Sequence, residues 1–197
     1  MSSIKLKHSG GNGVIIAAPA SNPAADRTLT CPDLTANATL ATVNGIREVD
    51  QWYTTSNITA NGDITSNLSR NTLTGSGCPL GTGMTESSGV FSFPIPGKYL
   101  VICKAAVVTD DSDNVYIGTM VTVNNGGAYT AVAYAGDGNN GSGSREGQGT
   151  TFYLLDVTDV GQVKVKFQVT SITGSSYVKG NASDLATAFT FIRIGDT

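Results

Sequence analysis

Three carboxylates fall within four positions of the sequence, at Asp110, Asp111 and Asp113. Carboxylate oxygens are ligands that Ca²⁺ prefers, and a bound cation relieves the repulsion between neighbouring carboxylates. The spacing departs from that of an EF-hand, because Val115 occupies the position that requires glycine and no glutamate closes the loop. The ordinary interpretation is a solvated loop between two strands, so we predict no resident metal and keep these three residues as the candidate ligands.

The glycine pattern Gly136–Gly141 matches G-x-G-x-x-G. In a dinucleotide site this pattern follows a strand and opens a helix, whose N-terminus meets the pyrophosphate. Here the segment continues through SGSREGQG into another predicted strand. We therefore predict a flexible hairpin loop and no cofactor.

Nucleophilic catalysis needs a base beside the nucleophile. The only histidine, His8, lies near the N-terminus, and Glu48, Glu86 and Glu146 are isolated in the sequence. No G-x-S-x-G motif occurs. We predict that the protein is not an enzyme.

Composition excludes further classes of function. A net charge of −3 gives no electrostatic footprint for nucleic acid, and no apolar run approaches the length that inserts into a membrane. No secretory signal is visible at the N-terminus, so the three cysteines, Cys31, Cys78 and Cys103, are interpreted as free thiols of a reducing compartment. An interchain disulfide is the alternative.

Small polar residues dominate the chain, since Thr, Gly, Ser and Asn together make up two residues in five. Leu, Glu and Lys, which favour helices, are scarce, so strands and turns must position whatever site exists. We predict an extended N-terminal arm over residues 1–47 and a β-domain over residues 48–197. The apolar residues expected to anchor the arm are Ile4, Leu6, Val14, Ile15, Ile16 and Leu29.

The second half of the chain reads as a run of strands. The turn Asn124–Gly127 allows positive φ at its central residues and predicts a hairpin. The segment 163–169 alternates apolar and polar residues, which predicts one face toward solvent. With seven or eight strands at this spacing, we predict an all-β fold, an antiparallel β-sandwich of jelly-roll topology. The expected strands are 51–55, 90–93, 99–108, 115–123, 129–135, 151–157, 163–169 and 189–194.

The segment 91–99, F-S-F-P-I-P-G-K-Y, resembles a signature of the C1q-like domain that enters a central strand. Segments 152–165 and 189–192 are similar to the late hairpin and the last strand of that family, although Val101 stands where many members carry an aromatic residue. This resemblance covers about residues 50–197 and implies a C1q/TNF-like jelly roll that forms a homotrimer.

The N-terminal segment SIKLKHSGGNGVIIAAPASNPAADRTLTCPD resembles the start of structural proteins of marine bacteriophages, including cyanophages. The stretches EVDQWYTTSNITANGDITSNLSR and GTGMTESSGVFSFP are similar to such proteins as well. Cys31 departs from the apolar residue expected there. This resemblance implies a virion protein, assembled in the host cytoplasm.

A strand that is apolar on both faces is typical of a sheet covered on both sides. Segments 99–103 and 153–155 have this pattern, which agrees with the packing at a three-fold axis that the C1q-like resemblance implies; a sheet covered by the domain's own loops is the alternative. The residues assigned to the trimer core are Tyr99, Val101, Tyr153, Leu155, Phe189 and Phe191.

These observations predict a trimeric virion surface appendage of the tail-fibre or spike type, anchored by its arm, with a C1q-like knob outward. Its partners are copies of itself, other virion proteins of the tail or capsid, and a host surface glycan or protein. The alternatives are a capsid decoration protein at local three-folds, and a free C1q/TNF-like or lectin-like binding module.

Overall fold

The computed structural model describes residues 3–7, 10, 13–17 and 45–197. The chain divides into two compact units, Met1–Val43 and Asn44–Thr197. In the first unit, β1 (Ser3–Lys7) pairs antiparallel with β2 (Gly13–Ala17). The predicted extended arm therefore contains a two-stranded sheet, as the alternation of apolar residues and lysines around Ile4 and Leu6 indicated. Leu29 and Cys31 lie outside the described residues.

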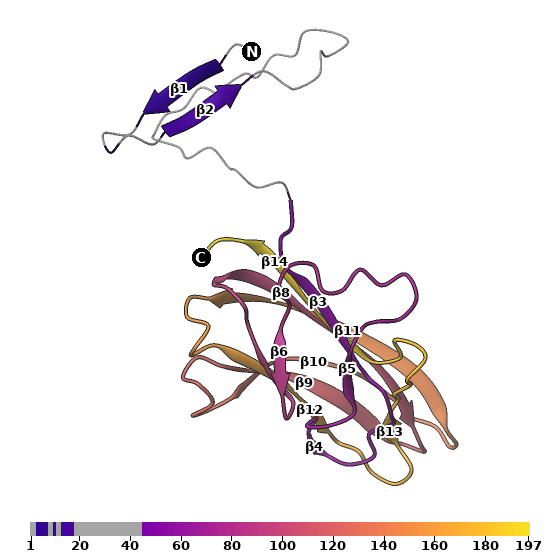
Figure 1. Ribbon diagram of the computed structural model, residues 1–197. Helices are drawn as coiled ribbons and strands as arrows, with labels where there is room; N and C mark the ends of the chain where they lie inside the picture. The colour runs from indigo at the N-terminus through magenta and orange to yellow at the C-terminus, as the bar shows by residue number, and fades with distance from the viewer. Residues whose placement is uncertain (1–2, 8–9, 11–12, 18–44) are drawn as a thin grey trace. The chain divides into compact units, whose positions relative to one another are not determined.

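The second unit is a sandwich of two antiparallel sheets, shown face to face in Figure 1. The first sheet has the order β11 (Arg145–Val157), β8 (Gly97–Thr109), β14 (Ala188–Gly195), β3 (Val49–Thr54) and β5 (Leu68–Arg70), with β13 (Tyr177–Val178) also paired to β8. The second sheet has the order β10 (Thr130–Gly138), β9 (Asn114–Thr122), β12 (Lys164–Thr170), β7 (Val90–Ser92) and β6 (Thr85–Ser87), with β4 (Gly62–Asp63) paired to β12. The predicted all-β sandwich is confirmed.

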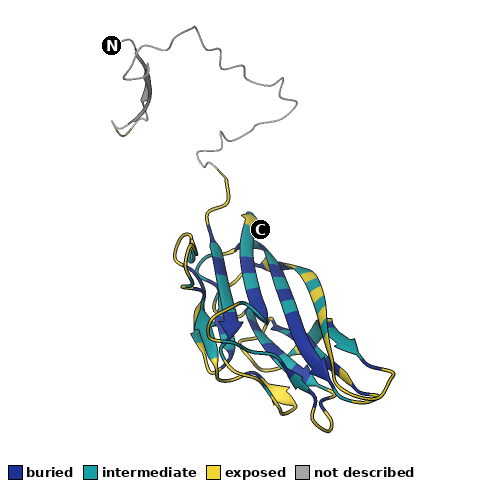
Figure 2. Cartoon of the chain, turned by 90° about the vertical axis from the view of Figure 1, so that its right-hand side faces the viewer, coloured by how far each residue is buried: buried dark blue, intermediate teal, exposed yellow. Residues whose placement is uncertain are grey.

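The core lies between the two sheets and is built from every second residue of the long strands. Phe167 of β12 stacks on Phe189 of β14 at 3.8 Å between ring centroids, and Phe91 of β7 contacts both rings. Val101 and Phe191 are each 1% exposed. Along β12 intermediate and buried residues alternate, which confirms the one-sided pattern predicted for this strand. Figure 2 shows the same alternation of buried and more exposed positions along neighbouring strands.

The hairpin between β9 and β10 forms at the predicted turn. Asn125 has a φ of 55° and Gly126 a φ of 88°, so the two central residues adopt the left-handed conformation that an Asn-Gly pair tolerates. The prediction for Gly136–Gly141 needs correction. Strand β10 continues to Gly138, and the loop then joins strands that belong to different sheets. A connection between the two layers, rather than a hairpin turn, follows β10.

Short strands in the polar segment 56–87 were missed. They contain two or three residues each and carry few apolar side chains, so a period-two pattern cannot develop in them. Among the described residues, no helix is long and apolar enough to cross a membrane.

Candidate functional site: the outer face of the first sheet

The side of the first sheet that faces away from the core carries a group of apolar side chains. Registers between the strands place Phe152 opposite Ile102, and Leu154 opposite Leu100. Ile192 of β14 lies on the other side of Leu100. Phe152 is 66% exposed and Leu154 59% exposed, whereas the other three side chains are half-buried. These five residues, which we call the apolar patch, form a continuous surface across β11, β8 and β14.

Charged pairs border the apolar patch at both ends of β8. At one end, Lys98 pairs with Asp156 at 3.0 Å. At the other end, the ammonium group of Lys179 lies 2.8 Å from a carboxylate oxygen of Glu146, and this hydrogen bond holds the pKa of Lys179 above its usual range. An apolar centre with a polar rim is the usual composition of a protein–protein interface.

A hollow of about 510 Å³ opens beyond the patch. Lys104 follows Ile102 on the same face of β8 and reaches across to donate a hydrogen bond to the carbonyl oxygen of Leu185 at 2.9 Å. Two lysines and two acidic residues line the hollow, so it has no net charge. Its lining residues are Lys104, Ala106, Val107, Glu146, Gly147, Gln148, Lys179, Asp184, Leu185 and Ala186.

The assignment of the trimer core needs correction. Tyr99, Val101, Leu155, Phe189 and Phe191 are 5% exposed or less within a single chain, because they occupy the inward positions of their strands. Tyr153 is half-buried and also packs against this core. The double-sided pattern itself is present, since the residues between these positions form the apolar patch. The sequence pattern located strands that are apolar on both sides, but the residues assigned to the trimer core lie on the side that packs inside the single chain.

Burial inside the sandwich alters two groups near this sheet. Burial, with the negative charge of Glu48 beside it, raises the pKa of Tyr99 to about 12, and its hydroxyl donates to the carbonyl oxygen of Ile95. Burial also raises the pKa of the Cys103 thiol, which is fully enclosed. Cys78 and Cys103 are free thiols.

The three aspartates of the candidate metal loop do not converge. Asp113 is buried and accepts backbone hydrogen bonds from Asn114 and Thr173, whereas Asp111 is exposed and accepts one from Gly143. Burial acts to raise the pKa of Asp113, but its hydrogen bonds outweigh this effect, and the pKa lies below its usual range. Within residues 3–7, 10, 13–17 and 45–197, no three acidic, histidine or cysteine side chains are grouped to hold a metal ion.

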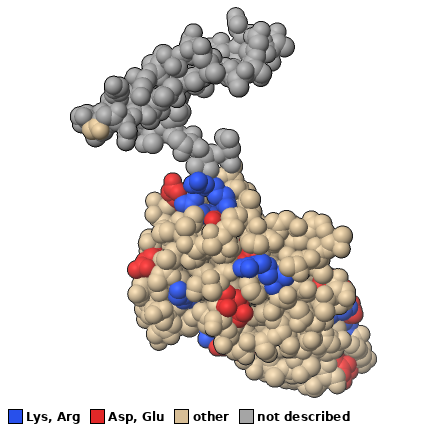
Figure 3. Space-filling model, viewed as in Figure 1, with Lys and Arg blue, Asp and Glu red and all other residues tan. Residues whose placement is uncertain are grey.

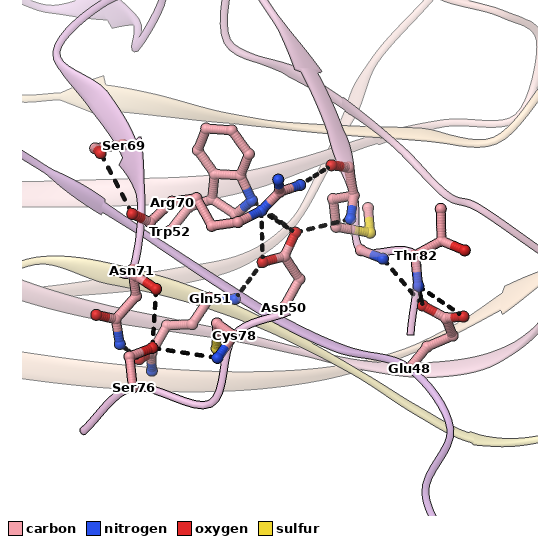
Figure 4. A network of polar contacts seen from close by, with 12 residues as sticks. Glu48, Asp50, Gln51, Trp52, Ser69, Arg70, Asn71, Ser76, Cys78 and Thr82 are labelled. Atoms are coloured by element: carbon pink, nitrogen blue, oxygen red, sulfur yellow. Dashed lines mark hydrogen bonds and ion pairs between the residues drawn. The ribbon is translucent and has the colours of Figure 1, made fainter. Parts of the chain in front are cut away.

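A network of polar contacts holds the edge of the first sheet and was not predicted (Figure 4). Asp50 of β3 is 1% exposed, and its carboxylate accepts hydrogen bonds from the Trp52 indole at 2.9 Å, from the Arg70 Nε at 3.1 Å and from the Met84 backbone at 2.7 Å. The Arg70 guanidinium also lies 4.9 Å from the centre of the Trp52 ring.

Glu48 extends this network toward the segment 80–84. Its carboxylate accepts hydrogen bonds from the backbone nitrogens of Thr82 and Gly83 at 2.9 Å and 3.1 Å. These contacts fix an irregular segment that has little secondary structure of its own. The only signal in the sequence was the alternation of Glu48 and Asp50 before an aromatic residue.

The order of the strands and the packing of two antiparallel sheets define a jelly roll. This chain is similar to the solved structure of Eiger TNF from S. frugiperda, with a TM-score of 0.57 and 9% identity over 78% of this chain and 96% of that chain. Murine APRIL at pH 5.0 gives a TM-score of 0.51 and 9% identity over 75% and 98%. The globular domain of the zebrafish complement 1qA protein gives a TM-score of 0.49 and 13% identity over 76% and 99%.

No protein-family model matches the chain, and no curated protein sequence matches it. At identities near 10%, the two similarities above a TM-score of 0.5 establish the fold alone. The second unit therefore has a TNF-like jelly-roll fold. The outer face of its first sheet carries the apolar patch described above.

Proposed function

We propose that this chain is a trimeric structural protein of a bacteriophage virion, a surface appendage of the tail-fibre or spike type. The unit Asn44–Thr197 is the outward knob, and the N-terminal unit attaches the trimer to other virion proteins. Assembly takes place in the host cytoplasm. The protein acts by binding, with no catalytic step.

The observation that carries self-association is the apolar patch. Phe152 and Leu154 each expose more than half of their surface on one face of β11. The half-buried Leu100 and Ile192 lie beside them on the neighbouring strands. Exposed apolar clusters with a polar rim mark interaction surfaces in soluble proteins. A second copy of the same module is the partner we assign to the patch, and the number of three copies comes from the resemblance to the C1q-like domain.

The two-stranded sheet β1–β2 supports the anchoring role of the N-terminal unit. An isolated two-stranded hairpin is marginally stable in water, so it gains stability when it packs on another surface. Because the segment resembles the start of marine bacteriophage structural proteins, we assign that surface to another virion protein. The low net charge of −3 also suits a protein that packs against other chains. Much of the face in Figure 3 carries no charged side chain.

The self-association is tested by light scattering of the full chain at micromolar concentration. We expect the mass of a trimer, and a monomeric mass would contradict the proposal. A matched pair of variants tests the surface. Phe152→Asp places a charge within the apolar patch, at its 66% exposed aromatic residue, and should give monomers. Val123→Asp places the same charge at a 69% exposed position directly after β9, in the turn that leads to β10, and should leave the trimer intact.

The virion role is tested by complementation with a deletion of residues 2–30. The truncated chain should remain trimeric yet fail to enter particles, whereas a double variant Lys5→Ala and Lys7→Ala should still enter. Normal incorporation of the deletion would contradict anchoring by the N-terminal unit. Immunogold labelling of intact particles then separates a tail appendage from a capsid decoration protein, because the gold marks the tail in one case and the head in the other.

A further inference from the structure

The outer face of the second sheet carries two tyrosines that lie beside glycines. In the register between β9 and β10, Tyr134 is opposite Gly118 and Tyr116 is opposite Gly136. A Cβ atom at Gly118 would lie 3.0 Å from the Cε1 of Tyr134, and one at Gly136 would lie 2.8 Å from the Cδ1 of Tyr116. The Tyr134 ring therefore occupies the space that a side chain at Gly118 would need, whereas at Gly136 the backbone of β9, through the carbonyl oxygen of Val115, approaches such a Cβ atom even more closely than the Tyr116 ring does.

This arrangement leaves much of one ring open to solvent. Tyr134 is 55% exposed although it stands in the middle of a strand rather than at a turn. Met120 lies next along the same face of β9 and is half-buried. Because the glycines have no side chains beside the rings, the surface between Tyr116 and Tyr134 is formed by the two aromatic rings and the backbone.

A row of polar side chains continues this surface onto β12 and β4. Gln168 lies opposite Gly118 on the other side of β9, and Asp63 lies opposite Gln168. Asp63 accepts hydrogen bonds from Lys166 at 2.6 Å and from Gln168 at 2.8 Å. The ammonium group of Lys166 also lies 4.2 Å from the centre of the Tyr129 ring.

The charges in this row cancel. Lys166 and Asp63 form an ion pair, and Gln168 is neutral. The surface thus presents no net charge to a ligand, although it offers amide, carboxylate and hydroxyl groups at fixed positions. An anionic polymer would find no unpaired cation among the residues of this row.

We propose that the residues Tyr116, Tyr134, Gln168, Lys166 and Asp63, which we call the tyrosine platform, bind an uncharged glycan chain. Sugar rings place C–H groups against the faces of aromatic rings. The negative face of the aromatic ring attracts the partly positive hydrogen atoms of these groups. The hydroxyl groups of a sugar both donate and accept hydrogen bonds. They can therefore pair with the Gln168 amide, which does both, and with the Asp63 carboxylate, which accepts. The absence of net charge in the row favours a neutral saccharide over a phosphate-bearing one.

This inference deepens the proposed function, on which it rests for biological setting, because it names the ligand class of the knob. The apolar patch belongs to the first sheet and the tyrosine platform to the second. Self-association through the first sheet therefore leaves the platform to a different partner. A peptide segment could also use exposed tyrosines, and this occupant is an outcome of the test rather than part of the proposal.

The test uses the full chain in affinity electrophoresis through gels that contain dextran, mannan, a β-glucan or no polysaccharide, followed by titration calorimetry with oligosaccharides of any retarding polymer. We expect retardation by at least one neutral polysaccharide. Tyr134→Ala should weaken binding about tenfold, in line with the free energy of an aromatic contact, and Tyr134→Phe should retain binding because the ring remains. Gly118→Ala should also weaken binding, because its methyl group displaces the ring.

A matched control is Tyr177→Ala, which removes a half-buried tyrosine from β13 of the first sheet and should leave binding unchanged. The proposal is overturned if no polysaccharide retards the chain, if Tyr134→Ala binds as well as the parent, or if Tyr134 is needed only for capture of a protein. Thermal melting and light scattering of each variant separate loss of fold from loss of binding. A monomer that binds glycan through Tyr134 would refute the proposed trimer and support the tyrosine platform. A trimer that binds no glycan would support the proposed trimer and refute the tyrosine platform.

Discussion

Replacement of Leu154 with Ala tests the apolar patch at the position where the structure allows its cost to be worked out. Full burial of a leucine side chain contributes about 2 kcal/mol. Leu154 is 59% exposed in the single chain, so an interface can still bury more than half of it. Alanine still buries part of this area, so the substitution removes about 1 kcal/mol of association free energy per chain.

In a trimer the loss occurs three times, which gives about 3 kcal/mol for the assembly and about a hundredfold change in its dissociation constant. The dissociation constant of a trimer scales with the square of the protein concentration. The concentration at the midpoint of dissociation should therefore rise about tenfold. Because Leu154 is 59% exposed in the single chain, little of this loss should appear in the stability of the single chain.

Sedimentation velocity over a dilution series measures the midpoint, and thermal unfolding measures the fold. Val123→Ala is the control, because Val123 is 69% exposed and lies outside the first sheet. An unchanged midpoint for Leu154→Ala would refute the placement of the interface on this face. So would an equal shift for Val123→Ala, since the effect would then be unrelated to the patch.

Three further variants test the interior and its buried acids. Phe167→Ala removes a ring that is 1% exposed and stacks on Phe189, and it should lower the free energy of unfolding in urea by about 3–5 kcal/mol; a loss below 1 kcal/mol would contradict the described core. Asp50→Asn removes the buried charge that the Arg70 guanidinium contacts, at a cost of about 3 kcal/mol, the low end for a broken buried pair because the arginine is 31% exposed; urea unfolding of Asp50→Asn at pH 7 checks this value. Asp113 has a lowered pKa in the fold, because its hydrogen bonds outweigh the opposing effect of burial. Its contribution to the free energy of unfolding is therefore complete above the ordinary pKa of 3.8 and disappears as the pH falls through the lowered pKa. Between pH 6 and pH 2 the melting temperature should therefore fall less steeply in Asp113→Asn than in the parent. Parallel curves of melting temperature against pH would refute this linkage.

Much of the sandwich could be predicted from local patterns. The strand at 163–169 and the hairpin at Asn124–Gly127 needed only alternation and turn chemistry, both of which depend on neighbours in the sequence. The short strands of the segment 56–87 could not be predicted, because two or three polar residues carry no period. They form where backbone groups of distant strands, such as β12, complete the hydrogen bonds of the chain.

The candidate site was harder to predict than the fold. Apolar residues on both faces of segment 99–103 indicated a sheet covered twice, but the pattern is symmetric and does not say which face meets the chain's own core. The six residues assigned to the trimer core, four of them aromatic, pack into the core of the single chain instead. The Asp50 network and the tyrosine platform each join residues from several strands, so their sequence signals are single polar or aromatic residues without a motif.

Composition, turn residues and strand periodicity determined by themselves that this chain is a β-protein with few charges and a distinct N-terminal segment. These properties depend on the preferences of single residues and their near neighbours. The tertiary structure alone decided which side of each strand faces the core, because one sheet must cover the other before inside and outside exist. It thereby left Leu100, Phe152 and Leu154 on one outer surface and Tyr116 and Tyr134 on the other, where the proposed partners bind.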